Sequence, residues 1–356
     1  MKNNAISFAR RTLGAVAIAT SLVSTSAIAQ DTEYPEMTIK VGHALPETFI
    51  WAEFVDKWFF SEVERRSGGK IKMQVFWSGS LIQPKQVIDA VGSGAVAMGA
   101  DAQGYYPSVI PLNTMPNALL GTTTFPNPRI GSMMTREIFE EFPEMQEEWS
   151  SQGVWPLYFN AAPNFRIACT SPIETVADMK GKKMRQFSAY HPKVWSSLDA
   201  VGVTVLPTEV YEGLQRGRLD CGFYDYSSLI SQKLYEQAKY VSTANFGAGA
   251  TWPMMVNYDQ FFNEWPDSVR TLITEVAQEA EARSIKISIE KNEEALQQLA
   301  DRGVTIVEFS AEEQAKLEER LPDFIDTWIE QQEGTDRHDA AMRIGGYMKK
   351  RIPEME

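Results

Sequence analysis

The residues between Pro266 and Gly303 form one long amphipathic stretch with no internal proline or glycine. Apolar residues recur along it at helical spacing, and a proline suits the first turn of a helix. As a single helix the stretch would be about 57 Å long, at about 1.5 Å per residue. That exceeds one domain of a chain this size, so we expect the helix to bridge two domains. Its apolar face comprises Val269, Leu272, Ile273, Val276, Ile285, Ile289, Leu296 and Leu299.

Two series of strand and helix patterns precede this stretch. In the first, residues 37–45 and 70–77 alternate as strands do, 48–66 has helical spacing, and 83–100 indicates a short helix, a turn and a strand. A second series starts after about residue 150, and such alternation is typical of α/β domains. We therefore predict an α/β fold with two domains. The remaining expected elements are strands at 154–170, 182–187, 203–207 and 303–309, a strand or turn at 219–226, helices at 191–202 and 208–218 (N-cap Thr208), and a mostly helical region at 311–352.

The N-terminus has the pattern of a secretory signal peptide. Lys2, Arg10 and Arg11 precede an apolar run over 13–23 that is too short to span a bilayer, and Ala27-Ile28-Ala29 is a small-residue cleavage site. We predict a signal peptide over 1–29 and export to the periplasm by the general secretory route. No later segment is apolar and long enough to predict stable membrane insertion.

The charge of the chain restricts its partners. The formal net charge is −13, and losing the three basic residues of the signal peptide, which holds no acidic residue, makes it −16. Such an acidic balance argues against nucleic acid or anionic membranes as partners. An anionic ligand would need local positive groups to hold it against this field.

Cysteine and histidine usage gives little chemistry. Cys169 and Cys221 would form one disulfide in an oxidising compartment, or two free buried thiols, and the sequence leaves both open. His43, His191 and His338 lie far apart without ligand spacing, so no metal site is expected.

Catalytic motifs are missing from the sequence. It contains no Gly-x-Ser-x-Gly elbow, phosphate loop, His-Glu-x-x-His or Cys-x-x-Cys. The glycine-rich run at 92–99 follows a predicted helix rather than a strand, which indicates a turn rather than a dinucleotide site. We expect neither an enzyme nor a bound cofactor.

Two arginines on predicted strands are candidate ligand groups. The planar fork of a guanidinium fits a carboxylate, so Arg166 and Arg185 could each hold an acid, although composition alone favours a surface charge on an edge strand for each. Aromatic residues are dense around them, as in many ligand sites, but they would also serve to fill two cores. These are Trp51, Tyr105, Tyr106, Trp155, Phe165, Phe187, Tyr190, Tyr224, Tyr226 and Trp252.

Five segments in order resemble a known family, over about residues 37–320. The chain is similar to the periplasmic solute-binding receptors of tripartite ATP-independent periplasmic (TRAP) transporters, of the dicarboxylate-receptor type. The segments are IKVGHALPET, GSLIQPKQVIDAVGSGAVAMG, ETVADMKGKKMRQFSA, VGVTVLPTEVYEGLQRGRLD and MMVNYDQFFNEWPDSVR.

The resemblance implies a fold and an anchor. It implies two α/β domains joined by crossing strands and spanned by a long helix, with the ligand in the cleft between them. The domains would comprise 31–160 with about 252–285, and 161–251 with about 286–356. Arg185 stands where the family's Lys-(Leu/Met)-Arg signature binds the substrate carboxylate, and Arg166 corresponds to a second family arginine. A TRAP permease is then the implied partner, with the receptor of an ATP-driven importer, a sensor partner or an exported enzyme as alternatives.

Two departures from the family pattern make the expected site more aromatic. Tyr224 stands near the position of a ligand-contacting asparagine, and Phe187 follows the arginine signature where many members have a small residue and proline. The ligand is expected to be an aromatic acid, a dicarboxylate, or a zwitterion whose cationic head lies on aromatic faces. The full set of expected ligand residues is Arg185, Arg166, Phe187, Tyr224, Trp252, Trp51, Tyr105, Gln103 and Asp225.

Overall fold

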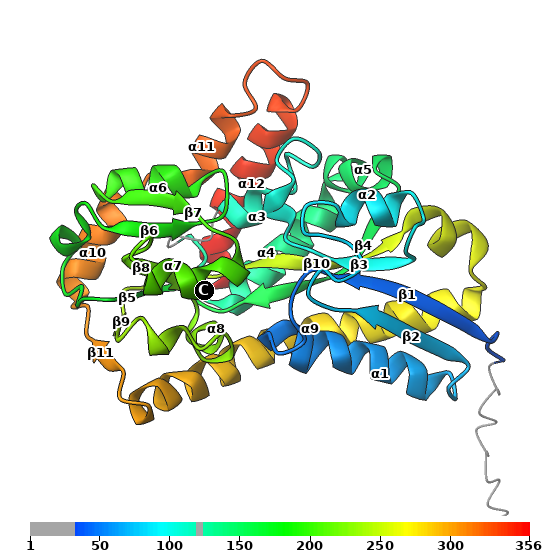
Figure 1. The fold of residues 1–356 in the computed structure, drawn as a ribbon. Coiled ribbons are helices and arrows are strands. Elements are labelled where there is room, and N and C mark those ends of the chain that lie inside the picture. The colour runs from blue at the N-terminus through cyan, green and yellow to red at the C-terminus, as the bar shows by residue number, and fades with distance from the viewer. Residues whose placement is uncertain (1–32, 119–123) are drawn as a thin grey trace, which may run out of the picture. The chain divides into compact units, whose positions relative to one another are not determined.

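The computed structural model describes residues 33–118 and 124–356, so the predicted signal peptide lies outside the described residues. Two sheets organise the chain (Figure 1). The first has the order β2-β1-β3-β10-β4, in which β1 pairs in parallel with β2 and β3, while β10 runs antiparallel to β3 and β4. Its strands are β1 (Met37–His43), β2 (Ile71–Phe76), β3 (Met98–Ala100), β4 (Val154–Ala162) and β10 (Gly249–Asn257).

The second sheet has the order β11-β9-β5-β8-β6-β7. Each sheet is the centre of one α/β domain, which confirms the predicted two-domain α/β fold. The strands of the second domain are β5 (Arg166–Cys169), β6 (Lys183–Gln186), β7 (Val201–Thr204), β8 (Cys221–Tyr224), β9 (Tyr240–Ser242) and β11 (Thr305–Val307).

Two connecting segments run from one domain to the other and lie side by side. One leads from β4 to β5 and the other from β9 to β10. The backbone N–H of Phe165 donates to the carbonyl of Gly247 at 2.8 Å, and that of Phe246 donates to the carbonyl of Phe165 at 3.1 Å. Gly247 has φ +83°, a conformation that glycine adopts at little cost. The paired crossings make a short hinge.

The predicted long helix is confirmed as α9 (Asp267–Asp301), which contacts elements of both domains (Figure 1). On the first domain, the N–H of Ala161 in β4 donates to the hydroxyl of Ser284 at 3.0 Å. On the second, the N–H of Tyr226 at the start of α8 (Tyr226–Ser231) donates to the side-chain oxygen of Asn292 at 2.9 Å. One rigid element therefore braces both domains on one side of the hinge.

Several predicted helices have different bounds or were not foreseen. The helix expected at 191–202 ends at Ser197, because Asp199 adopts the left-handed region (φ +55°) and the chain then enters β7. Thr208 is not an N-cap, since the following helix starts with a 3₁₀ turn at Pro207 and the carboxylate of Glu209 accepts from the N–H of Leu206 at 3.1 Å. Three helices were not predicted from the sequence, namely α4 (Pro128–Glu141), α5 (Pro143–Ser151) and α8.

The other helical elements cover the two sheets and form the C-terminal region. The expected helix over 48–66 is present as a π-helical turn followed by α1. No helix among the described residues is long and apolar enough to cross a membrane. The elements are η1 (Ala52–Asp56), α1 (Lys57–Arg66), α2 (Val87–Gly92), η2 (Gln103–Tyr105), α3 (Met115–Ala118), η3 (Val176–Met179), α6 (His191–Ser197), η4 (Pro207–Glu209), α7 (Val210–Gln215), η5 (Leu234–Glu236), η6 (Gln260–Glu264), α10 (Ala311–Arg320), α11 (Phe324–Glu330) and α12 (His338–Met355).

A disulfide joins neighbouring strands of the second sheet. Cys169 of β5 and Cys221 of β8 are direct partners in the antiparallel pair and are bonded to each other. Of the two alternatives that the sequence left open, the structure contains the disulfide. It links β5 to β8, and β8 in turn lies beside β6, which carries Arg185.

Candidate functional site

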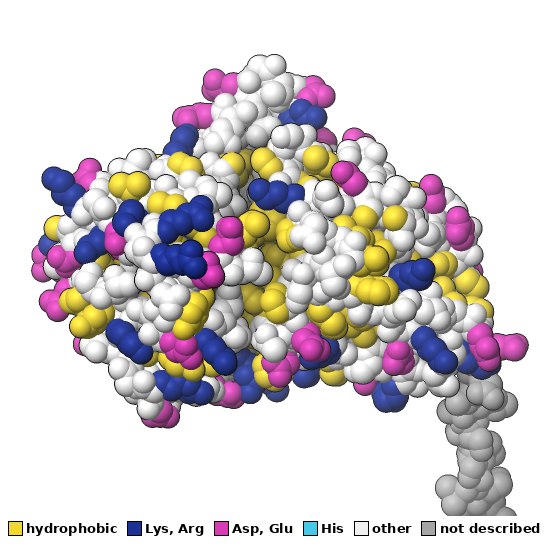
Figure 2. Space-filling model, in the orientation of Figure 1, with side chains coloured by type: hydrophobic (Ala, Val, Ile, Leu, Met, Phe, Trp, Pro, Cys, Tyr) yellow, Lys and Arg dark blue, Asp and Glu magenta, His cyan; other side chains and the backbone are white. Residues whose placement is uncertain are grey.

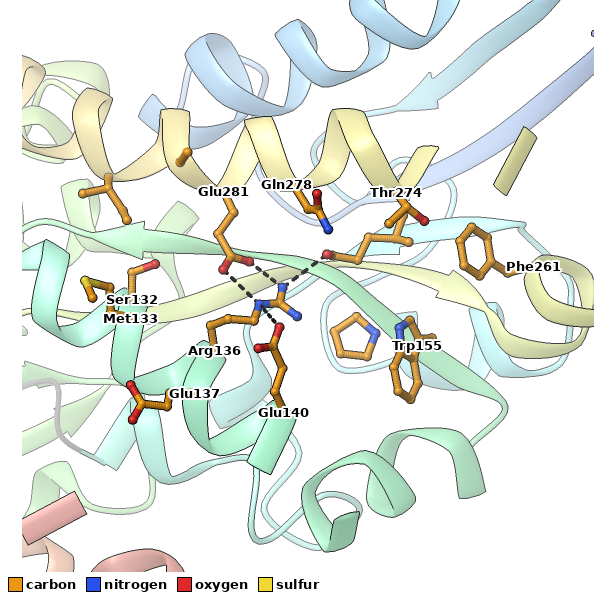
Figure 3. A pocket seen from close by; sticks show the side chains of 14 residues that line it. Ser132, Met133, Arg136, Glu137, Glu140, Trp155, Phe261, Thr274, Gln278 and Glu281 are labelled. Atoms are coloured by element: carbon orange, nitrogen blue, oxygen red, sulfur yellow. Dashed lines mark hydrogen bonds and ion pairs between the residues drawn. The ribbon is translucent and has the colours of Figure 1, made fainter. Parts of the chain in front are cut away.

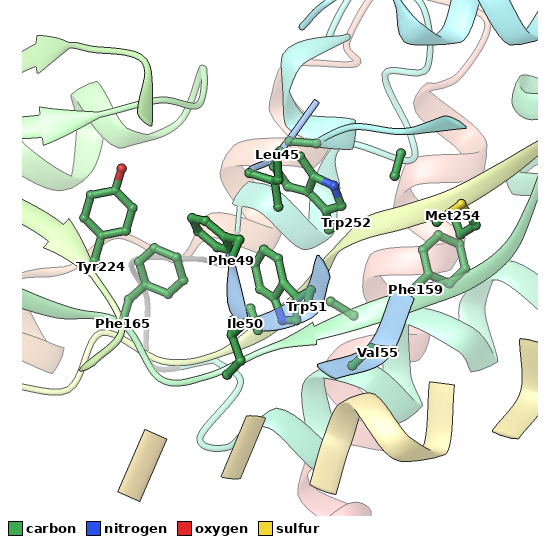
Figure 4. Close-up of a cluster of buried hydrophobic side chains, with 14 of the residues drawn as sticks. Leu45, Phe49, Ile50, Trp51, Val55, Phe159, Phe165, Tyr224, Trp252 and Met254 are labelled. Atoms are coloured by element: carbon green, nitrogen blue, oxygen red, sulfur yellow. The ribbon is translucent and has the colours of Figure 1, made fainter. Parts of the chain in front are cut away.

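Side chains of both domains converge on one aromatic cleft near the hinge. Hydrophobic side chains gather in the hollow between the domains in Figure 2, and Figure 4 shows Tyr224 and Phe165 facing the group of Phe49, Trp51 and Trp252. The first domain contributes Leu45, Phe49, Trp51, Ala102, Tyr105, Thr251 and Trp252, and the second contributes Phe165, Arg185, Phe187, Pro207, Tyr224, Asp225 and Ser228.

Arg185 is a buried cation in this cleft. Only 2% of the residue is exposed. Its Nε donates to the carbonyl of Val205 at 3.3 Å and its Nη1 to that of Phe223 at 3.2 Å. The guanidinium carbon lies 4.5 Å from the ring centroid of Phe187 and 4.2 Å from that of Tyr224. Among the described residues no carboxylate forms an ion pair with it, although leaving a buried charge without a counter-charge is costly.

The position of Arg185 follows from strand β6. The strand is paired in parallel with β7 and with β8, and Met184 before the arginine is fully buried on the other face. The indole nitrogen of Trp195 donates to the carbonyl of Arg185 at 3.2 Å, which holds the backbone from the side of α6. The guanidinium is thus presented by a fixed strand and held between two aromatic rings.

The wall of the first domain is a cluster of packed rings. The indole nitrogen of Trp51 donates to the carbonyl of Ala161 at 2.7 Å. Trp51 stacks on Trp252 with 5.9 Å between ring centroids, and Tyr105 meets Trp252 edge-on at 6.4 Å. Rings anchored in this way offer large apolar surfaces at low entropic cost.

The two phenols that line the cleft remain protonated. Burial raises the pKa of Tyr105 well above its ordinary value, and the positive charge of Arg185 only partly offsets this. Burial likewise raises the pKa of Tyr224, again opposed by Arg185. Both hydroxyls can therefore donate hydrogen bonds, and that of Tyr224 already points to the side chain of Gln232 at 3.4 Å.

Asp225 lines the cleft, but its carboxylate is occupied by donors of its own domain. It caps α8 by accepting from the N–H of Ser228 at 2.9 Å, and it also accepts from the hydroxyls of Ser227 and Ser228. Only 1% of the residue is exposed. The carboxylate is thus part of a helix cap.

Arg166 and Gln103 do not line the cleft in the structure. The Nε of Arg166 donates to the hydroxyl of Tyr226 at 3.1 Å, and its Nη1 donates to the side-chain oxygen of Asn245 at 2.6 Å. Gln103 donates to the carbonyl of Ala250 at 3.2 Å, which links η2 to β10. A role of Arg166 as a second anchor therefore has no support in the geometry.

The structure adds lining residues that the sequence analysis did not single out. Phe49, Pro207, Ser228 and Thr251 join the predicted set, as do the apolar Leu45 and Ala102. Pro207 belongs to a segment quoted for the family resemblance, and Thr251 adjoins the predicted Trp252, so both had a weak signal. Phe49 had none beyond the start of a helical pattern.

The free space in the cleft is small, about 40 Å³. A cavity of this size holds only a few water molecules. Any organic acid must therefore enter as the two walls move apart, because they belong to different domains that meet at the paired crossings.

A second, larger groove lies between α4, β4 and α9 and also contains an arginine (Figure 3). Here Arg136 is fully paired, since its Nε and Nη2 donate to the two carboxylate oxygens of Glu281 at 3.0 and 2.5 Å. Glu281 also accepts from the N–H of Phe159 at 2.9 Å. This ion pair ties α4 and β4 to α9.

The family model of bacterial extracellular solute-binding protein, family 7, matches residues 41–332. The chain belongs to this family. It is a family of solute-binding proteins, which confirms the predicted resemblance. The C4-dicarboxylate-binding periplasmic protein DctP of Rhodobacter capsulatus is 27% identical over 329 residues, which cover 88% of this chain and 92% of the relative.

Solved structures of similar receptors have the same fold. DctP6 of Bordetella pertussis, an extracytoplasmic solute receptor binding pyroglutamic acid, has a TM-score of 0.77 at 23% identity, over 89% of this chain and all of that one. A TRAP periplasmic solute-binding protein of Desulfovibrio salexigens with bound orotic acid has a TM-score of 0.74 at 18% identity, over 88% of this chain and 99% of that one.

Proposed function

We propose that this solute receptor binds a small carboxylate in the aromatic cleft and delivers it to a TRAP membrane permease. The observation that carries the proposal is Arg185, a buried guanidinium without a carboxylate partner among the described residues. A ligand carboxylate would supply the missing counter-charge in the planar geometry that a guanidinium fits. The ligands named for the relatives support this choice, since C4-dicarboxylates, pyroglutamate and orotate are all acids.

In the proposed mechanism the two domains close around the acid. Phe187 and Tyr224 hold the guanidinium, and the rings of Trp51, Tyr105 and Trp252 cover the rest of the ligand from the first domain. Closure about the crossings, between domains comprising 31–160 with about 252–285 and 161–251 with about 286–356, would present one joined surface to the permease. Export of the chain and cleavage after Ala29 place this event in the periplasm.

Binding is tested by titration calorimetry of the mature chain with acids that score in a thermal-shift screen. Losing one partner of a buried charge pair typically costs about 2–5 kcal/mol, so Arg185→Met should weaken binding by at least about 30-fold. Arg166→Met is the matched control, because that side chain bonds Tyr226 and Asn245 outside the cleft. An Arg185→Met variant that binds within a few fold of wild type would contradict the proposal.

Delivery needs its own measurement. Proteoliposomes holding a TRAP permease that accepts this receptor should take up the acid only when the receptor is present and an ion gradient is applied. Uptake that instead required ATP and an ATPase subunit would assign the chain to a different importer. Turnover of the bound acid would assign it to an exported enzyme.

A further inference from the structure

We propose that the acid held in the cleft is a flat aromatic monocarboxylate. This inference rests on the proposed function and narrows it to one class of substrate. It follows from the charges, the hydrogen-bonding groups and the ring surfaces that the two walls present.

The charges of the cleft fit a single carboxylate. Arg185 is the only cationic side chain among the described residues that line it. Arg166 is committed to Tyr226 and Asn245, and the ammonium of Lys85 lies 5.7 Å from the ring of Tyr105 on an exposed side chain that does not line the cleft. The second carboxylate of a dicarboxylate would be buried without a cation, which is strongly unfavourable.

The remaining polar groups are too few for a sugar acid. The hydroxyl of Ser228 donates to Asp225, and that of Tyr224 donates to Gln232. Among the described lining side chains, Tyr105, Thr251 and the indole N–H of Trp252, which has no hydrogen-bond partner, are left to meet the several hydroxyls of a sugar. Each buried hydroxyl without a partner costs binding free energy. A cationic head is also disfavoured, because the carboxylate of Asp225 already accepts from three donors of its own domain.

Aromatic rings on both walls of the cleft can bind the body of the ligand, for which the polar groups are too few. Phe165 and Phe187 meet with 6.0 Å between centroids on the wall of the second domain, and Trp51 and Trp252 stack at 5.9 Å on the opposite wall. An aromatic body between such walls gains stacking in addition to apolar burial. Since the free space is only about 40 Å³, a flat ligand demands the least separation of the domains.

Isothermal titration of the mature chain with a matched panel tests the inference. The panel holds benzoate, phenylacetate, indole-3-acetate and nicotinate as aromatic acids, cyclohexanecarboxylate as a saturated acid of similar size, and succinate, galacturonate and phenylalanine as the competing classes. At least one aromatic acid should bind about threefold or more tightly than cyclohexanecarboxylate, since an aromatic pair adds roughly threefold to tenfold. It should exceed the competing classes by at least about tenfold, because those bury unpaired polar or charged groups.

A variant then isolates the ring contribution. Phe187→Leu keeps an apolar side chain beside Arg185 and should weaken the best aromatic acid by roughly threefold to tenfold, with little change for cyclohexanecarboxylate. Phe142→Leu is the matched control, since its ring packs on Tyr347 away from the cleft. Circular dichroism and thermal unfolding of both variants establish that they fold.

The outcomes separate the inference from the function on which it rests. If succinate, galacturonate or phenylalanine binds most tightly and Arg185→Met removes that binding, the receptor function stands and the aromatic class is overturned. If cyclohexanecarboxylate binds as well as every aromatic acid, the stacking argument is overturned. If no acid of any class binds, both proposals are overturned.

Discussion

Two arginines in two hollows of this molecule have opposite surroundings. In the larger groove between α4, β4 and α9, Arg136 donates to both carboxylate oxygens of Glu281 (Figure 3). In the cleft, Arg185 has two backbone carbonyls and two aromatic rings, and no carboxylate pairs with it within residues 33–118 and 124–356. Arg185 is nevertheless the more buried, since 24% of the side chain of Arg136 is exposed.

Arg136 therefore stabilises the fold, whereas the guanidinium of Arg185 is available to pair with a ligand. Arg136 links α4 and α9 through a bond that the protein completes by itself, so a small molecule would have to break that bond to use it. Arg185 is desolvated and oriented in advance, but no residue that the structure describes supplies its counter-charge. Preorganised donors of this kind lower the cost of binding an anion. Size alone would have selected the groove around Arg136, because it is the larger of the two.

Supplying Arg185 with a carboxylate from the protein should remove this difference and produce the largest effect. Tyr105 lies across the cleft, close enough that the charge of Arg185 influences its pKa. Tyr105→Glu should therefore form an internal ion pair and weaken binding of the acid by more than about 100-fold, consistent with charge pairs worth about 2–5 kcal/mol. Titration calorimetry measures this loss.

The neutral variant Tyr105→Gln is the control for that loss. It removes the same ring and the same hydroxyl without adding a charge, so it should weaken binding by roughly tenfold or less. Equal losses in the two variants would mean that the ring of Tyr105, and not the free charge of Arg185, accounts for the effect.

The two arginines should rank differently for folding stability than for binding. Replacing Arg136 should lower the free energy of unfolding more than replacing Arg185, although only Arg185 is expected to bind the acid. Arg136→Met leaves Glu281 half-buried without its cation, and breaking such a pair costs about 3 kcal/mol of unfolding free energy when the site is partly exposed. Arg185→Met removes a buried charge that forms no ion pair within the described residues, so the loss of two carbonyl contacts should be offset and stability should change by less than about 1 kcal/mol. Urea unfolding of both variants without added acid measures the contrast, and a larger loss for Arg185→Met would contradict it.

The sequence singled out those residues of the candidate cleft that lie on local patterns. Arg185 and Phe187 were found because a strand pattern and a family signature coincide over a few residues, and Trp51 and Trp252 because aromatic residues are conspicuous. The long helix was predicted because its apolar spacing continues without a breaker, and α9 has nearly the predicted bounds. Periodicity and short motifs are local properties, so a single chain carries them openly.

The sequence could not reveal which side chains are satisfied by distant partners. Arg166 and Arg185 have the same chemistry, and only the structure shows that Asn245, far along the chain, bonds one of them. Likewise, only the structure shows that the carboxylate of Asp225 already accepts hydrogen bonds from the hydroxyls of Ser227 and Ser228 in α8. The predicted end of α6, residue 202, was wrong by several residues, since the left-handed residue Asp199 stops the helix at Ser197.

A buried anion near the cleft extends the comparison to the opposite charge. Asp101 is fully buried and accepts from the N–H of Lys85 and of Ala102, both at 2.8 Å, and from the hydroxyl of Tyr106 at 2.6 Å. No cation forms an ion pair with it in the described part of the chain. Burial outweighs these bonds and raises its pKa to about 6. Folding therefore disfavours the charged form of Asp101.

The raised pKa sets the sign of a smaller, pH-dependent effect. In the folded chain Asp101 takes up a proton near pH 6, whereas in the unfolded chain it does so near the ordinary value of about 4. Between these values the folded state binds more protons, so this residue makes the protein more stable as the pH falls. Relative to Asp101→Asn, the wild type should gain about 2 kcal/mol of unfolding free energy between pH 6.5 and pH 4.5. Urea unfolding of both proteins across this range measures the difference, and a constant difference would show that the hydrogen bonds of Asp101 fully offset its burial.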